Sequence, residues 1–234
     1  MNLLKLMKLE IRRNRMRAYM SASLIICMVL VGFIYFISYV AKVENEVDFQ
    51  KYPNIFLFTA IISMIMFSIL SAVMYARFVI EEYSGKKLLL LFSYPINRKE
   101  WLLSKLAIVM GFTTTAMILC NIPPFLLFWL TESISPIVND SLTLDLLFSM
   151  LKIIIVLSIC VNGISLIAMR IGFIQKSIPT TIVASFILCA LFGNAVIGSF
   201  GNDTILMLIL LIIVAIGVMI ILNLMNTVNR MEIE

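Results

Sequence analysis

The sequence predicts an all-α integral membrane protein with six transmembrane helices. A cytoplasmic amphipathic helix at the N-terminus and a helical cytoplasmic loop between the second and third spans complete the predicted fold. Of the 234 residues, 62% are hydrophobic and 13% are charged, whereas an ordinary soluble domain has about 25% charged residues. One globule of this size cannot bury so large an apolar excess, because its surface is too large relative to its volume. This composition excludes a soluble enzyme.

The long apolar runs are typical of membrane-spanning helices. A helix needs about 20 apolar residues to cross the hydrocarbon core, and only helices and closed barrels satisfy their backbone in lipid. These runs lack the two-residue alternation of barrel strands. We therefore predict a single transmembrane domain over residues 1–234, with spans at Tyr19–Ala41, Ile55–Ala76, Leu106–Leu130, Leu146–Met169, Ile178–Phe200 and Ile205–Met225.

The distribution of charge predicts the orientation of the spans. With the N-terminus inside, 15 of the 18 basic residues lie on the inner side, and only Lys42, Lys51 and Lys152 lie outside or near the outer face. The outer side holds seven of the 13 acidic residues. Because Lys and Arg are enriched in cytoplasmic segments, we expect both termini in the cytoplasm. The first apolar run is too long for a cleaved signal peptide.

Residues 1–17 have the pattern of a basic amphipathic helix. Such a helix lies in the membrane interface with its cations near anionic lipid headgroups. It either anchors the topology alone or forms an elbow that also contacts a cytoplasmic partner. Leu3, Leu4, Met7 and Ile11 form its predicted apolar face, and Lys5, Lys8, Arg12 and Arg15 form its basic face.

Residues 77–105 form a long connection between the second and third spans. Glu82 precedes Lys86 by four residues, which supports a helical turn. Pro95 forces the residue before it out of the helical region, and Asn97 can cap a new helix that enters the third span. We predict helix, bend and helix, which is either a purely structural hairpin or a docking element for a soluble protein.

The order of these features resembles the permease subunit of a type-2 ABC exporter, as found in bacterial drug, bacteriocin and antimicrobial-peptide export. The resemblance rests on the N-terminal helix, the six spans and a loop of the form E-E-x-x-x-K…S-Y-P-x-x-R-K-E-x-x-x-x-K within residues 81–105. It implies a multi-pass protein of the bacterial cell membrane, a second permease copy or sister permease as partner, and a cytoplasmic ATPase subunit. It also implies that the ATPase docks on Glu81, Glu82, Tyr83, Ser84, Gly85, Lys86 and Lys87, with Tyr94, Pro95 and Arg98 holding the return of the loop.

The chain lacks the residues for energy coupling by itself. A phosphate-binding loop requires G-x-x-x-x-G-K-[ST], and the one Gly-Lys pair, Gly85-Lys86, follows Ile80 and precedes Lys87. The sequence contains no His, so we predict no metal site and no enzyme activity in this chain. ATP and Mg²⁺ are expected on the partner subunit. The basic residues lie between apolar runs rather than along a surface stripe, so nucleic acid is not an expected partner.

A few polar residues within the spans are candidates for a translocation path. Ser63, Phe67 and Ser71 share one face of the second span, although ordinary helix packing explains this spacing equally well. Lys152 lies within the fourth span, where it either reaches the interface with its ammonium group or contacts substrate. Asn194 either contributes to helix packing or to binding, in a stretch that is either re-entrant or a frayed helix end.

The combined features predict half of a dimeric, ATP-driven exporter that moves hydrophobic or amphipathic cargo outward. Candidate cargoes are a peptide toxin, an antimicrobial peptide or a drug, because the 16 Met and 16 Phe residues provide adaptable apolar surface. The alternative is a membrane immunity or assembly factor that binds a cytoplasmic partner without transport. A membrane enzyme is disfavoured because no intramembrane catalytic motif is complete.

Overall fold

A computed structural model describes residues 3–14, 16–44, 51–83, 98–134, 144–198 and 203–230. Every element in these ranges is helical. The elements are α1 (Leu3–Arg13), α2 (Met16–Glu44), α3 (Tyr52–Tyr75), the π-helix η2 (Ala76–Ile80), α5 (Arg98–Ile134), α6 (Leu144–Gln175), α7 (Ile178–Gly198) and α8 (Asp203–Arg230).

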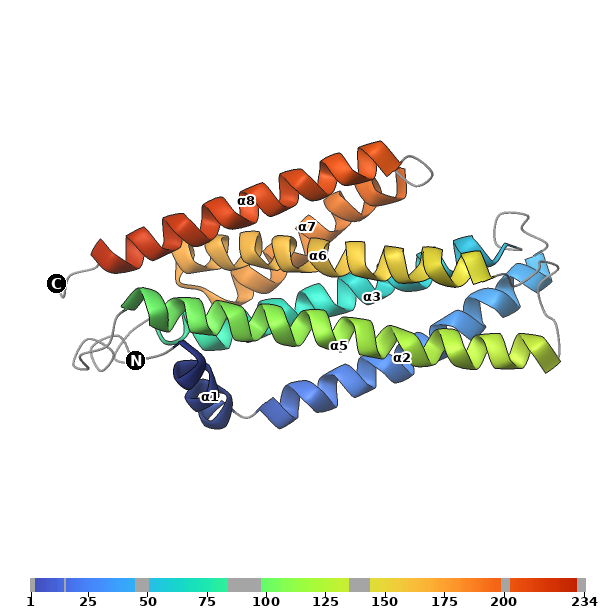
Figure 1. Cartoon of the computed structure of the whole chain (residues 1–234), viewed down its shortest axis with the longest axis horizontal. Helices are drawn as coiled ribbons and strands as arrows, with labels where there is room; N and C mark the ends of the chain where they lie inside the picture. Colours follow the sequence, from blue (N-terminus) through green and yellow to red (C-terminus); the bar gives the residue numbers. More distant parts are fainter. Residues whose placement is uncertain are drawn as a thin grey trace.

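Six of these helices are long and apolar enough to cross a membrane, which confirms the predicted fold class. They form an elongated bundle with both chain ends at one end of the molecule (Figure 1). The short helix α1 lies beside this same end, across the N-terminal part of α5 (Figure 1). The charge pattern predicts that this end faces the cytoplasm, and we call it the inner end.

The third span contains two prolines. Pro123 and Pro124 lie inside α5, which continues through both to Ile134. Proline is tolerated within membrane helices because neighbouring helices and local adjustments satisfy the freed backbone groups. Helix α7 likewise continues through Asn194 to Gly198, so the described part of that stretch is regular helix.

Helix α3 lies at the centre of the bundle and packs against α2, α5, α6 and α7. Most of its side chains are buried, which explains its solidly apolar sequence. Helix α8 is the most peripheral span and approaches α6 at Gly163, where an added Cβ would lie 2.0 Å from Cγ2 of Ile213. Only a residue without a side chain permits this close contact.

Asparagine side chains join the helices inside the bundle. The Asn121 amide donates to Ser63 Oγ at 2.7 Å, which links α5 to α3. The Asn162 amide donates to Thr114 Oγ1 at 2.7 Å, and its oxygen accepts from Thr113 at 3.1 Å. These bonds join α6 to α5 and satisfy polar groups that lipid cannot hydrogen-bond.

The outer end of the bundle is held by aromatic rings. Phe128 makes edge contacts with Tyr35, Tyr52 and Phe56 at centroid distances of 5.9, 6.1 and 5.9 Å. The Tyr52 hydroxyl donates to Glu132 Oε2 at 2.9 Å, and both side chains are buried. This outer aromatic cluster, made of Tyr35, Tyr52, Phe56, Phe125 and Phe128, joins α2, α3 and α5.

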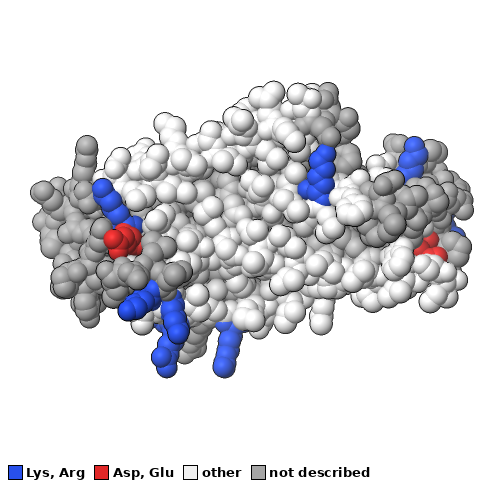
Figure 2. All heavy atoms as spheres, in the orientation of Figure 1, with Lys and Arg blue, Asp and Glu red and all other residues white. Residues whose placement is uncertain are grey.

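Charged side chains gather at the ends of the bundle. Figure 2 shows a broad, mostly uncharged surface between the ends, with the larger group of Lys and Arg side chains near the end that holds α1. A lipid-facing belt flanked by basic segments is the pattern expected of a multi-pass membrane protein.

Candidate functional site

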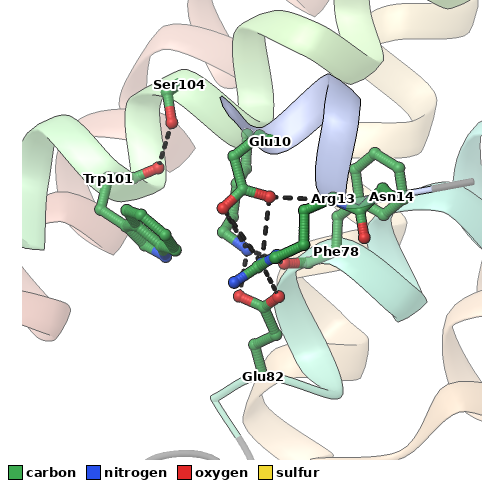
Figure 3. A network of polar contacts seen from close by, with 8 residues as sticks. Glu10, Arg13, Asn14, Phe78, Glu82, Trp101 and Ser104 are labelled. Atoms are coloured by element: carbon green, nitrogen blue, oxygen red, sulfur yellow. Dashed lines mark hydrogen bonds and ion pairs between the residues drawn. The ribbon is translucent and has the colours of Figure 1, made fainter. Parts of the chain in front are cut away.

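Four charged side chains from three parts of the chain meet at the inner end of the bundle. Glu10 and Arg13 come from α1, and Glu82 follows η2 (Figure 3). Lys105 lies in the second turn of α5. We call these four residues the inner charge cluster. The cluster ties the N-terminal helix to both ends of the predicted docking loop.

Helix α1 packs through a face that matches the predicted one in part, since Met7 packs against the buried core as expected. Leu6 is fully buried and Glu10 is 1% exposed, whereas Ile11, expected on the apolar face, is 47% exposed. A buried carboxylate on a packing face requires a cationic partner. The protein provides two such partners, Arg13 and Lys105.

Glu10 is held mainly from its own helix. Arg13 Nη2 donates to Glu10 Oε2 at 3.0 Å, and Asn14 Nδ2 donates to the same oxygen at 2.9 Å. The Arg13 guanidinium also pairs with Glu82, so it lies between the two carboxylates (Figure 3). One arginine thereby joins α1 to the chain that leaves η2, 69 residues further on.

Lys105 is the most buried cation of the described residues, with 0% of its side chain exposed. Its ammonium group donates to the Phe78 carbonyl at 2.8 Å, pairs with Glu82, and lies 3.7 Å from Glu10 Oε1. It therefore donates hydrogen bonds to η2 and to the turn after η2, and its charge also pairs with Glu10 on α1. Removing this one side chain would leave two carboxylates in a desolvated place.

The Trp101 indole covers the two cations of the cluster. The Arg13 guanidinium carbon lies 5.3 Å and the Lys105 ammonium nitrogen 5.1 Å from the ring centroid. A cation within about 6 Å of an indole face is attracted by its quadrupole. Trp101 thus stabilises the two positive groups of the inner charge cluster.

A π-helical turn sets the position of Phe78 and Glu82. At the end of η2 the Glu81 amide donates to the Ala76 carbonyl at 2.9 Å, one residue further back than in an α-helix. The Tyr83 amide then donates to the Val79 carbonyl at 3.0 Å, which is the ordinary α-helical spacing. Such turns are frequent at functional sites. This change of register ends the span and brings Glu82 under α1 and α5.

The inner charge cluster is electrically balanced, with two acids and two bases. Burial raises the pKa of Glu10 above its ordinary value, while the charges of Lys105 and Arg13 oppose this shift. The net rise means that removal from water outweighs the attraction of the cations. A buried cluster of this kind provides specific geometry more than stability.

The residues predicted to dock the ATPase have different positions. Glu82 points into the inner charge cluster, and Tyr83 is 3% exposed with its ring 5.8 Å from that of Phe173. Glu81 is half-buried, and Arg98 begins α5. Ser84, Gly85, Lys86, Lys87, Tyr94 and Pro95 lie outside the described residues.

The residues predicted to line a translocation path do not come together in this chain. Ser63, Phe67 and Ser71 are fully buried within the bundle. Lys152 and Asn194 are exposed on α6 and α7, and the Asn194 amide donates to the Ala190 carbonyl of its own helix at 2.9 Å. Their role in transport stays a prediction.

Sequence reasoning missed Glu10, Arg13 and Lys105 as members of a site. Two signals were present: Glu10 is the one acid in the basic segment 1–17, and Lys105 is the last residue of the loop pattern. Neither signal alone predicts a contact, because the partners lie on separate elements. The structure supplies the missing pairing.

The fold and the inner charge cluster define a six-span membrane protein whose N-terminal helix is fixed to the segment between its second and third spans. The sequence model of ABC-2 family transporter proteins matches residues 6–191. The chain therefore belongs to the ABC-2 transporter family and is a membrane transport permease.

The chain is also similar to an uncharacterized protein, YcbO, of Bacillus subtilis (strain 168). The two are 30% identical over 191 residues, which cover 82% of this chain and 84% of the relative. No solved structure matches the chain. Permeases of this family work with an ABC ATPase.

Proposed function

We propose that this permease is one half of a dimeric, ATP-driven exporter of hydrophobic or amphipathic cargo. A separate cytoplasmic subunit hydrolyses ATP and docks on the segment between α3 and α5. A second copy or a sister permease completes the translocation unit in the bacterial cell membrane. Outward transport of peptide toxins, antimicrobial peptides or drugs is the proposed direction and cargo class.

The inner charge cluster is the observation that carries this proposal. An ATPase bound to residues 84–97 would pull on both ends of that segment, Glu82 and the start of α5. Glu82 and Lys105 are paired to each other, and both are joined to α1. A movement of the docking segment would therefore move α1, the end of η2 and α5 together.

The first test is purification of the tagged chain from its native membrane in a mild detergent, with subunit masses and ATP hydrolysis recorded. We expect a nucleotide-binding subunit to copurify. Glu82→Lys places a third cation among Arg13 and Lys105, so repulsion should open the cluster. This variant should lose coupled ATP hydrolysis and transport at least tenfold while inserting into the membrane normally.

Gln175→Lys is the matched control. Gln175 is exposed at the C-terminal end of α6 and is not a member of the inner charge cluster, so the added cation should leave ATP hydrolysis and transport unchanged. A chain that purifies alone and supports no ATP hydrolysis would favour the immunity or assembly factor instead. Equal transport by Glu82→Lys and the parent would remove the cluster from the coupling route.

A further inference from the structure

A cavity of about 790 Å³ lies at the inner end between the α1–α2 corner and the end of α3. Its volume is within the range of about 300–1,000 Å³ common for ligand sites. It is distinct from the predicted path residues, since Ser63, Phe67 and Ser71 do not line it. The space between these helices is therefore large enough for a small-molecule or lipid ligand.

The lining of the cavity is divided into a polar and an apolar part. Two small residues one turn apart, Ala18 and Ala22, open space along α2, and Ile26 continues this wall. Helix α3 provides the opposite apolar wall with Met66, Ile69, Leu70 and Val73. The polar part lies at the inner end, with Arg13, Asn14, Tyr19, Arg77, Glu81 and Glu82.

Of the two arginines that line the cavity, Arg77 is the one available to a ligand. Arg13 is already held by Glu10 and Glu82. Arg77 is exposed and takes no part in the ion pairs of the described residues. Glu81 and Glu82 line the same end, so Arg77 itself, rather than a general positive potential, is the group that can select an anion. Arg17, exposed on the first turn of α2, lies outside the lining.

We propose that this cavity binds a phosphate-bearing diacyl lipid of the inner leaflet. The phosphate accepts hydrogen bonds from the Arg77 guanidinium, which matches its planar, forked donors to phosphate oxygens. The acyl chains lie along the apolar walls of α2 and α3. The bound lipid fills the space between α2 and α3 beside the inner charge cluster. This inference does not depend on the direction or cargo of transport.

The test measures lipid retention by native mass spectrometry and thermal unfolding of the purified chain in dodecyl maltoside. The probes are dioleoyl phosphatidylglycerol and dioleoyl phosphatidylethanolamine. Dioleoylglycerol has the same chains without phosphate, and inorganic phosphate has no chains. We expect one phospholipid to remain bound and to raise the unfolding temperature, and neither partial probe to replace it.

Two variants test the polar and the apolar part separately. Arg77→Gln should weaken phospholipid binding about tenfold, as expected for the loss of a charge-assisted hydrogen bond. Ala22→Leu should reduce binding by filling the cavity while the chain stays folded. Arg17→Gln removes a cation at the same end but outside the lining, and should weaken binding less than twofold.

Three results would overturn the proposal. One is equal phospholipid retention by the parent, Arg77→Gln and Ala22→Leu, which would describe ordinary boundary lipid. Another is competition by dioleoylglycerol or by inorganic phosphate as effective as that of the phospholipid. The third is Arg77-dependent retention of an amphipathic peptide in place of any phospholipid.

Discussion

The two ends of the bundle are held together by opposite kinds of chemistry. At the inner end, four charges and one indole join α1, the turn after η2 and α5. At the outer end, five aromatic rings join α2, α3 and α5, with one phenol–carboxylate hydrogen bond. Glu10 and Lys105 at the inner end are as buried as Tyr52, Phe56 and Phe128 at the outer end, whereas Arg13 is 48% exposed.

The difference lies in how each end responds to displacement. Ring contacts in the outer aromatic cluster are short-ranged, and each contributes about 0.5–1.5 kcal/mol beyond area burial, so one ring can shift without changing the charge of its neighbours. In the inner charge cluster, displacement of Glu82 leaves the fully buried Lys105 ammonium group with only the more distant Glu10 carboxylate as its ionic partner, at 3.7 Å. The inner end is therefore an all-or-none connection, whereas the outer end is a graded one.

Lys105→Met should break the inner end with the largest effect. It removes the ammonium group shared by Glu10, Glu82 and the Phe78 carbonyl, and breaking a buried ion pair in this way costs about 3–5 kcal/mol. We expect a large fall in the unfolding temperature in detergent and loss of coupled ATP hydrolysis in the purified complex.

Two companion variants separate charge from packing. Lys176→Met removes an exposed cation at the same end and should change stability little. Lys105→Met combined with Glu82→Met leaves Glu10 and Arg13 as a balanced pair, so most of the lost stability should return while coupling stays low. A single Lys105→Met variant as stable as the parent would contradict the all-or-none description.

Phe128→Leu should weaken the outer end by an intermediate amount. It keeps most of the buried volume but removes three ring contacts, so we expect a loss of about 2 kcal/mol, from pairs of about 0.5–1.5 kcal/mol each. Thermal unfolding measures this loss. ATP hydrolysis per folded complex should remain as in the parent, and coupling lost as severely as in Lys105→Met would show that the two ends are not distinct.

The six spans could be predicted from the sequence because lipid imposes a strong local rule. Every run long enough to cross the bilayer must be apolar, and the rule acts within one segment at a time. The resemblance to ABC-2 permeases followed from the same order of segments. The predicted third span includes Pro123 and Pro124, and α5 stays helical through both because neighbouring helices can satisfy the freed backbone groups.

The inner charge cluster could not be predicted because its pairs are distant in sequence. Arg13 and Glu82 are 69 residues apart, and Lys105 and Glu82 are 23 apart. Periodicity pairs Glu82 with Lys86, which lies outside the described residues, and it includes Ile11 rather than Glu10 in the packing face of α1. Local patterns favour an apolar contact there, and only the docking of α1 on α5 makes a buried carboxylate tolerable.

The smallest expected effect is a pH dependence of the docking of α1 at the inner end, without a large loss of stability. Burial raises the pKa of Glu10 above its ordinary value of 4.5 despite Lys105 and Arg13. Docked α1 therefore binds the Glu10 proton more tightly than released α1 does. By linkage, docking gains stability as the pH falls towards 4.5 and loses it as the pH rises through the raised pKa.

Hydrogen exchange of the peptide that covers residues 3–14, corrected for the intrinsic pH dependence of exchange, measures this change. We expect protection of α1 to increase as the pH is lowered from neutral, and Glu10→Gln to flatten the profile whatever its starting level. Helix α8 provides the internal control, since residues 205–225 contain no titratable side chain. An unchanged slope in Glu10→Gln would assign the pH response to another group. A flat profile in the parent would instead mean that the two cations compensate fully for the burial of Glu10.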